Sequence, residues 1–311
     1  MTDPAVNDPA VADPAVADPA VAALTWRDRV ETVEPTVLVL GGFMSSPPMY
    51  RGLRGLLLER DAAEVVVAPI WMPDWILAAA RGQGAVAMRA GRALLRASAA
   101  SAESPLSRGA PVLVVGHSAG GVIARILTSP DPFTERAMNG SGRIGAIVTL
   151  GTPHMFDAAS RAAQKPGETS RWANEHVPGA FFAPRVGYLC VSSRAVVGRL
   201  DGDAKARRTD RFYRGVVDVP AGTPIPGDGV VPLAAALLPG VESIVLDDAE
   251  HSNVIARSWY GDAGHVDAWW PRAVEIWRDA LRARMGADGD RRASLAPPAG
   301  DPASREATGI G

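Results

Sequence analysis

The sequence predicts an α/β protein in which a mostly parallel central sheet carries helices on both faces. Short runs made almost entirely of apolar residues alternate with segments of helical pattern along the 311 residues. Strands of this kind lack the polar alternate positions of a half-exposed sheet, so both of their faces are expected to be buried. The predicted strands are residues 36–40, 64–70, 112–115, 144–150, 187–191 and 243–247, and the predicted helices are 47–60, 76–100, 119–129 and 267–284.

The first helix illustrates how the helices are assigned. Ser46 is a suitable N-cap and Pro47 suits the first helical position, where no backbone N–H is needed. Leu53, Leu56 and Leu57 then fall on one face, which is expected to pack on the sheet. The later helices are assigned from similar Ala-, Arg- and Leu-rich patterns. Ligands of such parallel sheets bind at the carboxyl ends of the strands, so those ends are where functional residues are sought.

The folded unit is predicted to span residues 24–285. Residues 1–23 repeat the motif DPAV with a proline every fifth position, which rules out a regular helix and predicts a disordered tail. Residues 286–311 have the same loose composition and are also predicted to be disordered. Within the unit, the insertions 152–185 and 194–232 interrupt the alternation and are expected to form caps over the strand ends.

The composition argues against several classes of protein. A net charge of −2 and the absence of a basic stripe give no support to nucleic-acid binding. No apolar run approaches the roughly 18 residues that span a bilayer, and no basic residue precedes Arg27 as a secretory signal would require, so a soluble cytoplasmic protein is expected. Cys190, the only cysteine, lies in an apolar run and is expected to be a buried, inert thiol. No metal-ligand spacing is present, and neither a metal nor another cofactor is expected.

Ser118 is the candidate nucleophile. It lies in Gly116-His117-Ser118-Ala119-Gly120, directly after the strand 112–115 and directly before a predicted helix. A bare G-x-S-x-G is a weak signal, but this strand–turn–helix setting is the one that a nucleophile elbow requires. The alternative is an ordinary glycine turn with a surface serine.

A serine nucleophile of this kind is followed along the chain by an acid and then by a histidine. His251 is the candidate base because it follows the strand 243–247 and precedes the last helix. Asp228, in the turn PGDGVVP, is the preferred acid, and Asp247 and Asp248 remain rivals because they lie close to His251. The other histidines lie in the elbow, before any suitable acid, or near the last helix: His117, His154, His176 and His265.

An oxyanion hole for such a serine needs two backbone N–H groups. One is expected from Ala119, the residue after the nucleophile. The other is expected from the loop after the strand 36–40, with Phe43 preferred and Met44 as the alternative.

The motifs together resemble a known family. GHSAGG (116–121), LGTPH (150–154), GDGVVP (227–232) and EHS (250–252), in this order and spacing, resemble lipase-like α/β-hydrolases of the GPI inositol-deacylase type, and VPGAFF and SWYG resemble their soluble bacterial and plastid relatives. The resemblance covers about residues 36 to 280. It implies an α/β-hydrolase fold, a Ser118–Asp228–His251 triad and esterase or lipase activity. The sequence departs from many hydrolases in having Gly41-Gly42 in place of His-Gly, and it lacks the membrane spans of the eukaryotic deacylases.

The expected reaction is cleavage of a carboxylic ester with a lipid or medium-chain acyl group, through an acyl-enzyme. Acyl transfer on the same triad and a non-catalytic binding role are the alternatives. An apolar pocket wall is one interpretation of the remaining aromatic and apolar segments, and core packing is the other. The residues singled out for that wall are Met44, Trp71, Trp75, His154, Phe181 and Phe182. The sequence gives no indication of oligomeric state.

Overall fold

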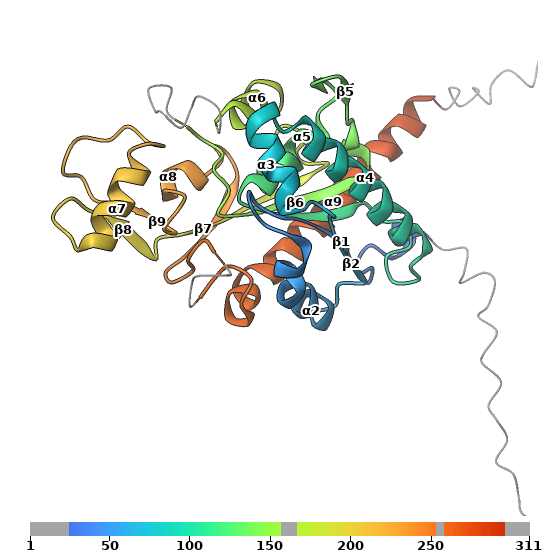
Figure 1. Cartoon of the computed structure of the whole chain (residues 1–311). Helices are drawn as coiled ribbons and strands as arrows, with labels where there is room; N and C mark the ends of the chain where they lie inside the picture. The colour runs from blue at the N-terminus through green and yellow to red at the C-terminus, as the bar shows by residue number, and fades with distance from the viewer. Residues whose placement is uncertain (1–24, 157–166, 253–257, 296–311) are drawn as a thin grey trace, which may run out of the picture.

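The core of the protein is a six-stranded sheet with the order β10-β7-β6-β3-β1-β2 (Figure 1). The computed structural model describes residues 25–156, 167–252 and 258–295, so the predicted N-terminal tail and the end of the C-terminal one lie outside the described residues. Every strand pair in this sheet is parallel, and the α/β prediction is confirmed. The strands are β1 (Thr36–Leu40), β2 (Glu64–Val67), β3 (Val112–His117), β6 (Ile144–Leu150), β7 (Gly187–Ser193) and β10 (Glu242–Leu246).

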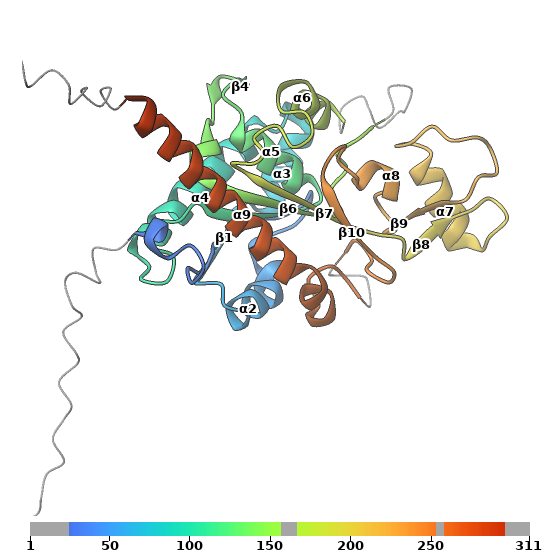
Figure 2. The same cartoon turned by 180° about the vertical axis from the view of Figure 1, so that it is seen from behind.

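Successive residues of the inner strands face opposite layers, as strand geometry requires. In β1, Val37 and Val39 belong to one core cluster, whereas Leu38 and Leu40 belong to the other. The first cluster is covered by α2 (Arg51–Glu59) and α9 (Ala263–Leu295), and α9 lies across the face of the sheet that is turned to the viewer in Figure 2. The second cluster is closed by α3 (Met72–Arg81), α4 (Gly84–Glu103) and α5 (Ala119–Thr128). Two buried apolar layers therefore hold the sheet between them.

Two helix boundaries differ from the prediction. The predicted helix 76–100 is two helices, α3 and α4, separated at Gly82 and Gln83. The last helix begins at Ala263 and continues to Leu295, so residues 286–295 are helical and not part of a disordered tail. The helical pattern of this segment is obscured in the sequence by its many Gly, Asp and Arg residues.

The insertion 194–232 forms most of a small lobe beside the sheet, seen at the left of Figure 1. The small lobe consists of β8 (Val196–Gly198), α7 (Ala204–Tyr213), β9 (Ile225–Gly227) and α8 (Leu233–Ala236). It has an apolar core of its own, which includes Tyr213, Val216, Ile225, Val231 and Ala235.

The other insertion, 152–185, contains α6 (Glu168–His176), and its residues 157–166 lie outside the described part. Arg125 of α5, although buried, donates hydrogen bonds through Nη2 to the carbonyls of Ala173 (3.3 Å) and Val177 (2.9 Å). A cation at a helix C-terminus is favourable, so this contact fixes α6 to the helix that follows Ser118. The remaining short elements are η1 (Trp26–Arg29), η2 (Pro47–Tyr50), β4 (Pro132–Phe133), β5 (Arg136–Ala137) and η3 (Gly140–Gly142).

In the described part of the chain, no helix has the length and apolarity that a membrane crossing needs.

Candidate active site

Ser118 occupies a strained turn between β3 and α5. Its backbone angles are φ 52° and ψ −128°, in a region that residues with a side chain rarely adopt. The turn is tight because α5 starts directly against β1: a Cβ atom on Gly120 would collide with the carbonyl oxygen of Leu40. Ser118 N–H donates to the carbonyl of Leu150 in β6 (2.9 Å), which holds the turn to the neighbouring strand.

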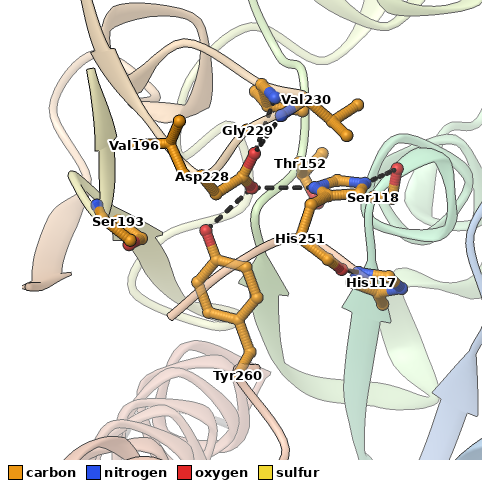
Figure 3. A network of polar contacts seen from close by, with 12 residues as sticks. His117, Ser118, Thr152, Ser193, Val196, Asp228, Gly229, Val230, His251 and Tyr260 are labelled. Carbon is orange, nitrogen blue, oxygen red and sulfur yellow. Dashed lines mark hydrogen bonds and ion pairs between the residues drawn. The ribbon is translucent and has the colours of Figure 1, made fainter. Parts of the chain in front are cut away.

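Ser118, His251 and Asp228 form a continuous chain of hydrogen bonds (Figure 3). Ser118 Oγ lies 2.9 Å from His251 Nε2, and His251 Nδ1 lies 2.7 Å from Asp228 Oδ2. All three side chains are buried. The structure thus brings together the serine, the acid and the base that were singled out in the sequence.

The two rival acids lie elsewhere. Asp247 pairs with Arg194 (2.5 Å) and Asp248 with His265 (2.8 Å), and both carboxylates are largely exposed. Neither is hydrogen-bonded to His251.

Asp228 is held as a carboxylate by four hydrogen bonds. Its Oδ1 accepts the backbone N–H groups of Val230 (2.9 Å) and Val231 (2.7 Å). Its Oδ2 accepts from His251 and from the hydroxyl of Tyr260 (2.9 Å). Burial alone would raise the pKa of this carboxyl, but the charge and hydrogen bond of His251 and the two backbone donors outweigh it, and the pKa is lowered.

The carboxylate determines the tautomer of His251. Because Asp228 Oδ2 can only accept, the proton lies on Nδ1 and the lone pair of Nε2 faces Ser118 Oγ–H. A histidine in this state can take the proton of the serine hydroxyl as the oxygen attacks.

His117, the residue before the nucleophile, contacts the main chain of His251. Its Nε2 lies 3.0 Å from the His251 carbonyl oxygen, and its Nδ1 lies 2.9 Å from the hydroxyl of Tyr50. Burial, followed by the nearby His251 charge, lowers the pKa of His117 to about 3, so the ring is neutral. The sequence places His117 only as a residue of the elbow and gives no indication that Tyr50 lies near the site.

The backbone N–H groups of Phe43, Met44 and Ala119 have no acceptor among the described residues. The neighbouring N–H of Gly42 is occupied, because it donates to the hydroxyl of Tyr50 (2.9 Å). Phe43 and Ala119 both line the cavity that opens at Ser118. They are the two residues that the sequence favours for an oxyanion hole, and Met44, the alternative to Phe43, is not in the cavity lining.

The Ser118 cavity has a volume of about 720 Å³, within the usual range for small-molecule sites. It lies between α3, α6 and the small lobe, and its walls are mainly apolar. Its lining includes Phe43, Ala78–Gln83, Phe133, Thr134, Pro153, Phe156, Glu168, Thr169, Trp172, Phe212, Val216 and Val230–Pro232.

None of the six residues singled out for the pocket wall is in that lining. Trp75 and His154 are fully buried, and Phe182 packs against the core beside α6. The other three are exposed at the surface: Met44, Trp71 and Phe181. The wall is formed instead by small residues at the end of α3, by Phe133 and Trp172, and by valines of the small lobe.

The motif LGTPH is explained by packing behind the site. Gly151 has φ +53° and passes directly behind Asp228, and Thr152 packs against Gly121 of α5. His154 lies 3.1 Å from Thr149 Oγ1 and 3.4 Å from Arg125 Nη1, a contact network without an acid. Burial lowers the pKa of His154 far below its usual value. Cys190 is buried as expected, and burial raises the pKa of its thiol.

No cluster of three or more His, Cys, Asp or Glu side chains that could hold a metal ion is found in the part of the chain that the structure describes.

Comparison with solved structures identifies the fold. The mature form of the Bacillus licheniformis lipase BlEst2 superposes with a TM-score of 0.51 at 12% identity, over 78% of this chain and 93% of the lipase. The chain has the α/β-hydrolase fold. A dienelactone hydrolase from Anabaena variabilis (TM-score 0.39, 15% identity, 79% of this chain and 87% of that one) is also similar. Esterase 2 of Thermogutta terrifontis is similar as well, with a TM-score of 0.41 and 14% identity over 79% of this chain and 82% of the esterase.

No protein-family model and no curated protein matches the sequence. The expected α/β-hydrolase resemblance is therefore confirmed at the level of the fold, and the narrower resemblance to GPI inositol-deacylases is not supported.

Proposed function

We propose that the protein is a serine hydrolase that cleaves a carboxylic ester through an acyl-enzyme. The observation that carries the proposal is the hydrogen-bonded chain from Asp228 through His251 to Ser118, which ends in a mainly apolar cavity. A serine on a strained turn with an imidazole lone pair directed at its hydroxyl is prepared for nucleophilic attack. The α/β-hydrolase fold is compatible with this chemistry.

In the proposed reaction, Ser118 Oγ forms a bond to the ester carbonyl carbon as its proton passes to His251 Nε2. The N–H groups of Phe43 and Ala119 stabilise the negative carbonyl oxygen. The carbon–oxygen bond to the alcohol then breaks, and the leaving oxygen takes the proton from His251. Water, activated by the same histidine, releases the acid and restores the serine.

This sequence of proton transfers orients the ester in the Ser118 cavity. The leaving oxygen must reach His251 Nε2, so the alcohol lies toward the loop that carries Asp228 and its hydrogen-bond donors, Val230 and Val231. Val216 packs with Val231 in the core of the small lobe and extends this wall. We call Val216, Val230 and Val231 the alcohol wall.

The acyl chain then lies against the opposite wall, formed by Ala78, Phe133 and Trp172, which we call the acyl wall. Phe133 and Trp172 pack edge to face with their ring centres 5.1 Å apart, and they belong to the apolar cluster on the α3–α5 side of the sheet. An apolar wall of this kind favours a medium-chain or lipid acyl group over a small polar one.

The test is hydrolysis of p-nitrophenyl esters from acetate to palmitate, together with labelling of the protein by a fluorophosphonate. We expect turnover and labelling in the wild type and the loss of both in Ser118→Ala. Ser98→Ala is the matched control, because the buried Ser98 hydroxyl on α4 has no hydrogen-bond partner among the residues that the structure describes, and it should behave as wild type.

The outcomes separate the alternatives. Labelling and ester product formed only when an acceptor alcohol is added would indicate acyl transfer. A folded wild type that shows neither labelling nor turnover would contradict the proposal and leave a binding role on the hydrolase fold.

A further inference from the structure

A second chain of hydrogen bonds runs beneath the site and is separate from the one that ends on Ser118. The N–H of Gly42 lies 2.9 Å from Tyr50 Oη, Tyr50 Oη lies 2.9 Å from His117 Nδ1, and His117 Nε2 lies 3.0 Å from the carbonyl oxygen of His251. Figure 3 shows the last of these contacts, with the His117 ring below the His251 main chain. The Tyr50 and His117 side chains are buried.

The two ends of this chain determine the direction of every hydrogen bond in it. An amide N–H can only donate and a carbonyl oxygen can only accept. Tyr50 Oη therefore accepts from Gly42 and donates to His117 Nδ1, and His117 Nε2–H donates to His251. Only the neutral Nε2–H tautomer of His117 satisfies all three contacts, and a buried ring beside His251 is held neutral.

Packing of aromatic rings excludes water from this chain of hydrogen bonds. The ring of Trp259 meets the rings of both Tyr50 and His117 edge to face, with ring centres 6.1 and 5.7 Å away. In a low-dielectric setting, a lost partner is not replaced by water, so each donor and acceptor depends on its neighbour.

Each end of the chain adjoins a group used in the proposed reaction. Gly42 precedes Phe43, His117 precedes Ser118, and the accepting carbonyl belongs to His251 itself. We propose that His117 and Tyr50 are positioning residues that hold the oxyanion loop and the main chain of His251 at a fixed distance from Ser118. This inference rests on the proposed function, and neither residue touches the Ser118 cavity.

Removing the Tyr50 hydroxyl should loosen both the Gly42 end and the His251 end of this hydrogen-bond chain. In Tyr50→Phe, His117 Nδ1 loses its donor and the N–H of Gly42 loses its acceptor. The oxyanion loop is then no longer connected to the His117 ring, and the ring that donates to His251 is held at one nitrogen only. Because a displacement of about 1 Å in an active site can cost on the order of 100-fold in rate, we expect kcat to fall about tenfold in Tyr50→Phe and further in His117→Leu. KM should stay unchanged, because the cavity lining is untouched.

The experiment measures kcat and KM on the best p-nitrophenyl ester, with active sites counted by fluorophosphonate titration, in the wild type, Tyr50→Phe, His117→Leu and His117→Gln. A glutamine amide nitrogen can occupy the place of His117 Nε2 and donate to His251, so His117→Gln should recover part of the kcat lost in His117→Leu. The matched control is Tyr188→Phe, which also removes a buried hydroxyl with one backbone donor, Phe182 N–H (3.3 Å), outside this chain. It should keep the wild-type kcat.

The readouts distinguish positioning from folding. A purely structural role would lower the titratable fraction of active sites and leave kcat per site unchanged, and that result would overturn the proposal. Nitrogen-15 NMR of labelled histidine checks the direction of the chain without any substrate: His117 in the Nδ1–H tautomer in the wild type would also overturn it. A wild type that is not labelled at Ser118 would overturn the proposed function and this inference together, whereas a labelled wild type with equally active variants would overturn this inference alone.

Discussion

The phenolic hydroxyl of Tyr260 donates a hydrogen bond to Asp228 Oδ2 over a distance of 2.9 Å. The same oxygen accepts from His251 Nδ1, while Oδ1 is occupied by two backbone N–H groups. Tyr260 lies just before α9, so the last part of the chain supports the acid of the triad from behind. Loss of the Tyr260 hydroxyl removes one of four donors, whereas loss of the carboxylate removes the acceptor that His251 Nδ1–H has among the described residues.

This difference predicts that removing the Asp228 carboxylate lowers kcat much more than removing the Tyr260 hydroxyl. Asp228→Asn should lower kcat on the order of 10⁴-fold, because the amide can donate to His251 and favour the wrong tautomer. Tyr260→Phe should lower kcat only a few fold, since about 1 kcal/mol is typical for one neutral hydrogen bond. Ester hydrolysis by purified variants measures both. A loss in Asp228→Asn as small as that in Tyr260→Phe would show that the carboxylate does not determine the tautomer of His251.

Gly151 should tolerate no side chain. It has φ +53°, and a Cβ atom there would lie 2.6 Å from Asp228 Oδ2 and 2.8 Å from a ring carbon of Tyr260. Gly151→Ala should therefore reduce the free energy of unfolding by about 1–3 kcal/mol and also lower kcat by displacing Asp228. Gly55→Ala in α2 is the control, because its Cβ would meet no atom within 4 Å and should stabilise the helix by about 0.5–1 kcal/mol. Urea unfolding of both variants gives the comparison; a stable, fully active Gly151→Ala would contradict the described backbone.

The two walls of the Ser118 cavity predict separable specificities. Ala78→Phe places a larger side chain on the acyl wall and narrows the cavity there. It should lower kcat/KM for esters of long acyl chains by at least about tenfold and leave kcat/KM for acetate esters of long alcohols unchanged. Val216→Phe narrows the cavity at the alcohol wall. It should lower kcat/KM for esters of long alcohols and leave kcat/KM for long acyl chains on short alcohols unchanged. Each variant is the control for the other on a panel of esters that varies the acyl and the alcohol chain independently. The opposite pattern would reverse the proposed orientation of the ester.

The sequence predicted those features that depend on local pattern. Each strand of the sheet is an apolar run, and the glycines around Ser118 indicate the elbow because the turn excludes larger residues. The chain order serine, acid, histidine then selected Asp228 and His251, although two other aspartates lie closer to His251 in the sequence. Asp228 is favoured in space because it follows β9 and its turn directs the carboxylate at the imidazole.

The cavity wall and the chain of Tyr50 and His117 depend on contacts between distant segments. Trp75 and Trp71 lie four residues apart, yet one is fully buried and the other is exposed, because Trp75 lies within α3 whereas Trp71 is the extended N-cap residue that precedes it. Nothing local distinguishes a tryptophan of the core from one of a pocket wall. Tyr50 and His117 are 67 positions apart, and their hydrogen bond exists only because the fold brings the last residue of η2 to the last residue of β3.

His265 predicts a pH dependence of stability in the segment that supports the site. Both of its ring nitrogens face acceptors: Nδ1 lies 2.7 Å from the carbonyl oxygen of Trp259, and Nε2 lies 2.8 Å from Asp248 Oδ1. Burial acts to lower the pKa of His265, but the hydrogen bonds to Asp248 and to the Trp259 carbonyl, with the charges of Asp248 and Asp262, outweigh it and raise the pKa. The folded protein therefore holds the imidazolium more tightly than the unfolded chain does.

A folded-state pKa above the unfolded value of about 6.5 stabilises the protein fully below that pH, and the contribution disappears as pH rises through the folded-state pKa. The urea midpoint of the wild type should thus decline between pH 6 and pH 9 more steeply than that of His265→Gln, which can still donate to Asp248 but cannot titrate. Because Trp259 and Tyr260 adjoin this contact, the wild type should also lose ester hydrolysis on heating earlier at pH 9 than at pH 6. Parallel pH profiles of the midpoint in the two proteins would show that His265 is neutral in the folded state and that the Trp259 carbonyl or Asp248 is not its partner in solution.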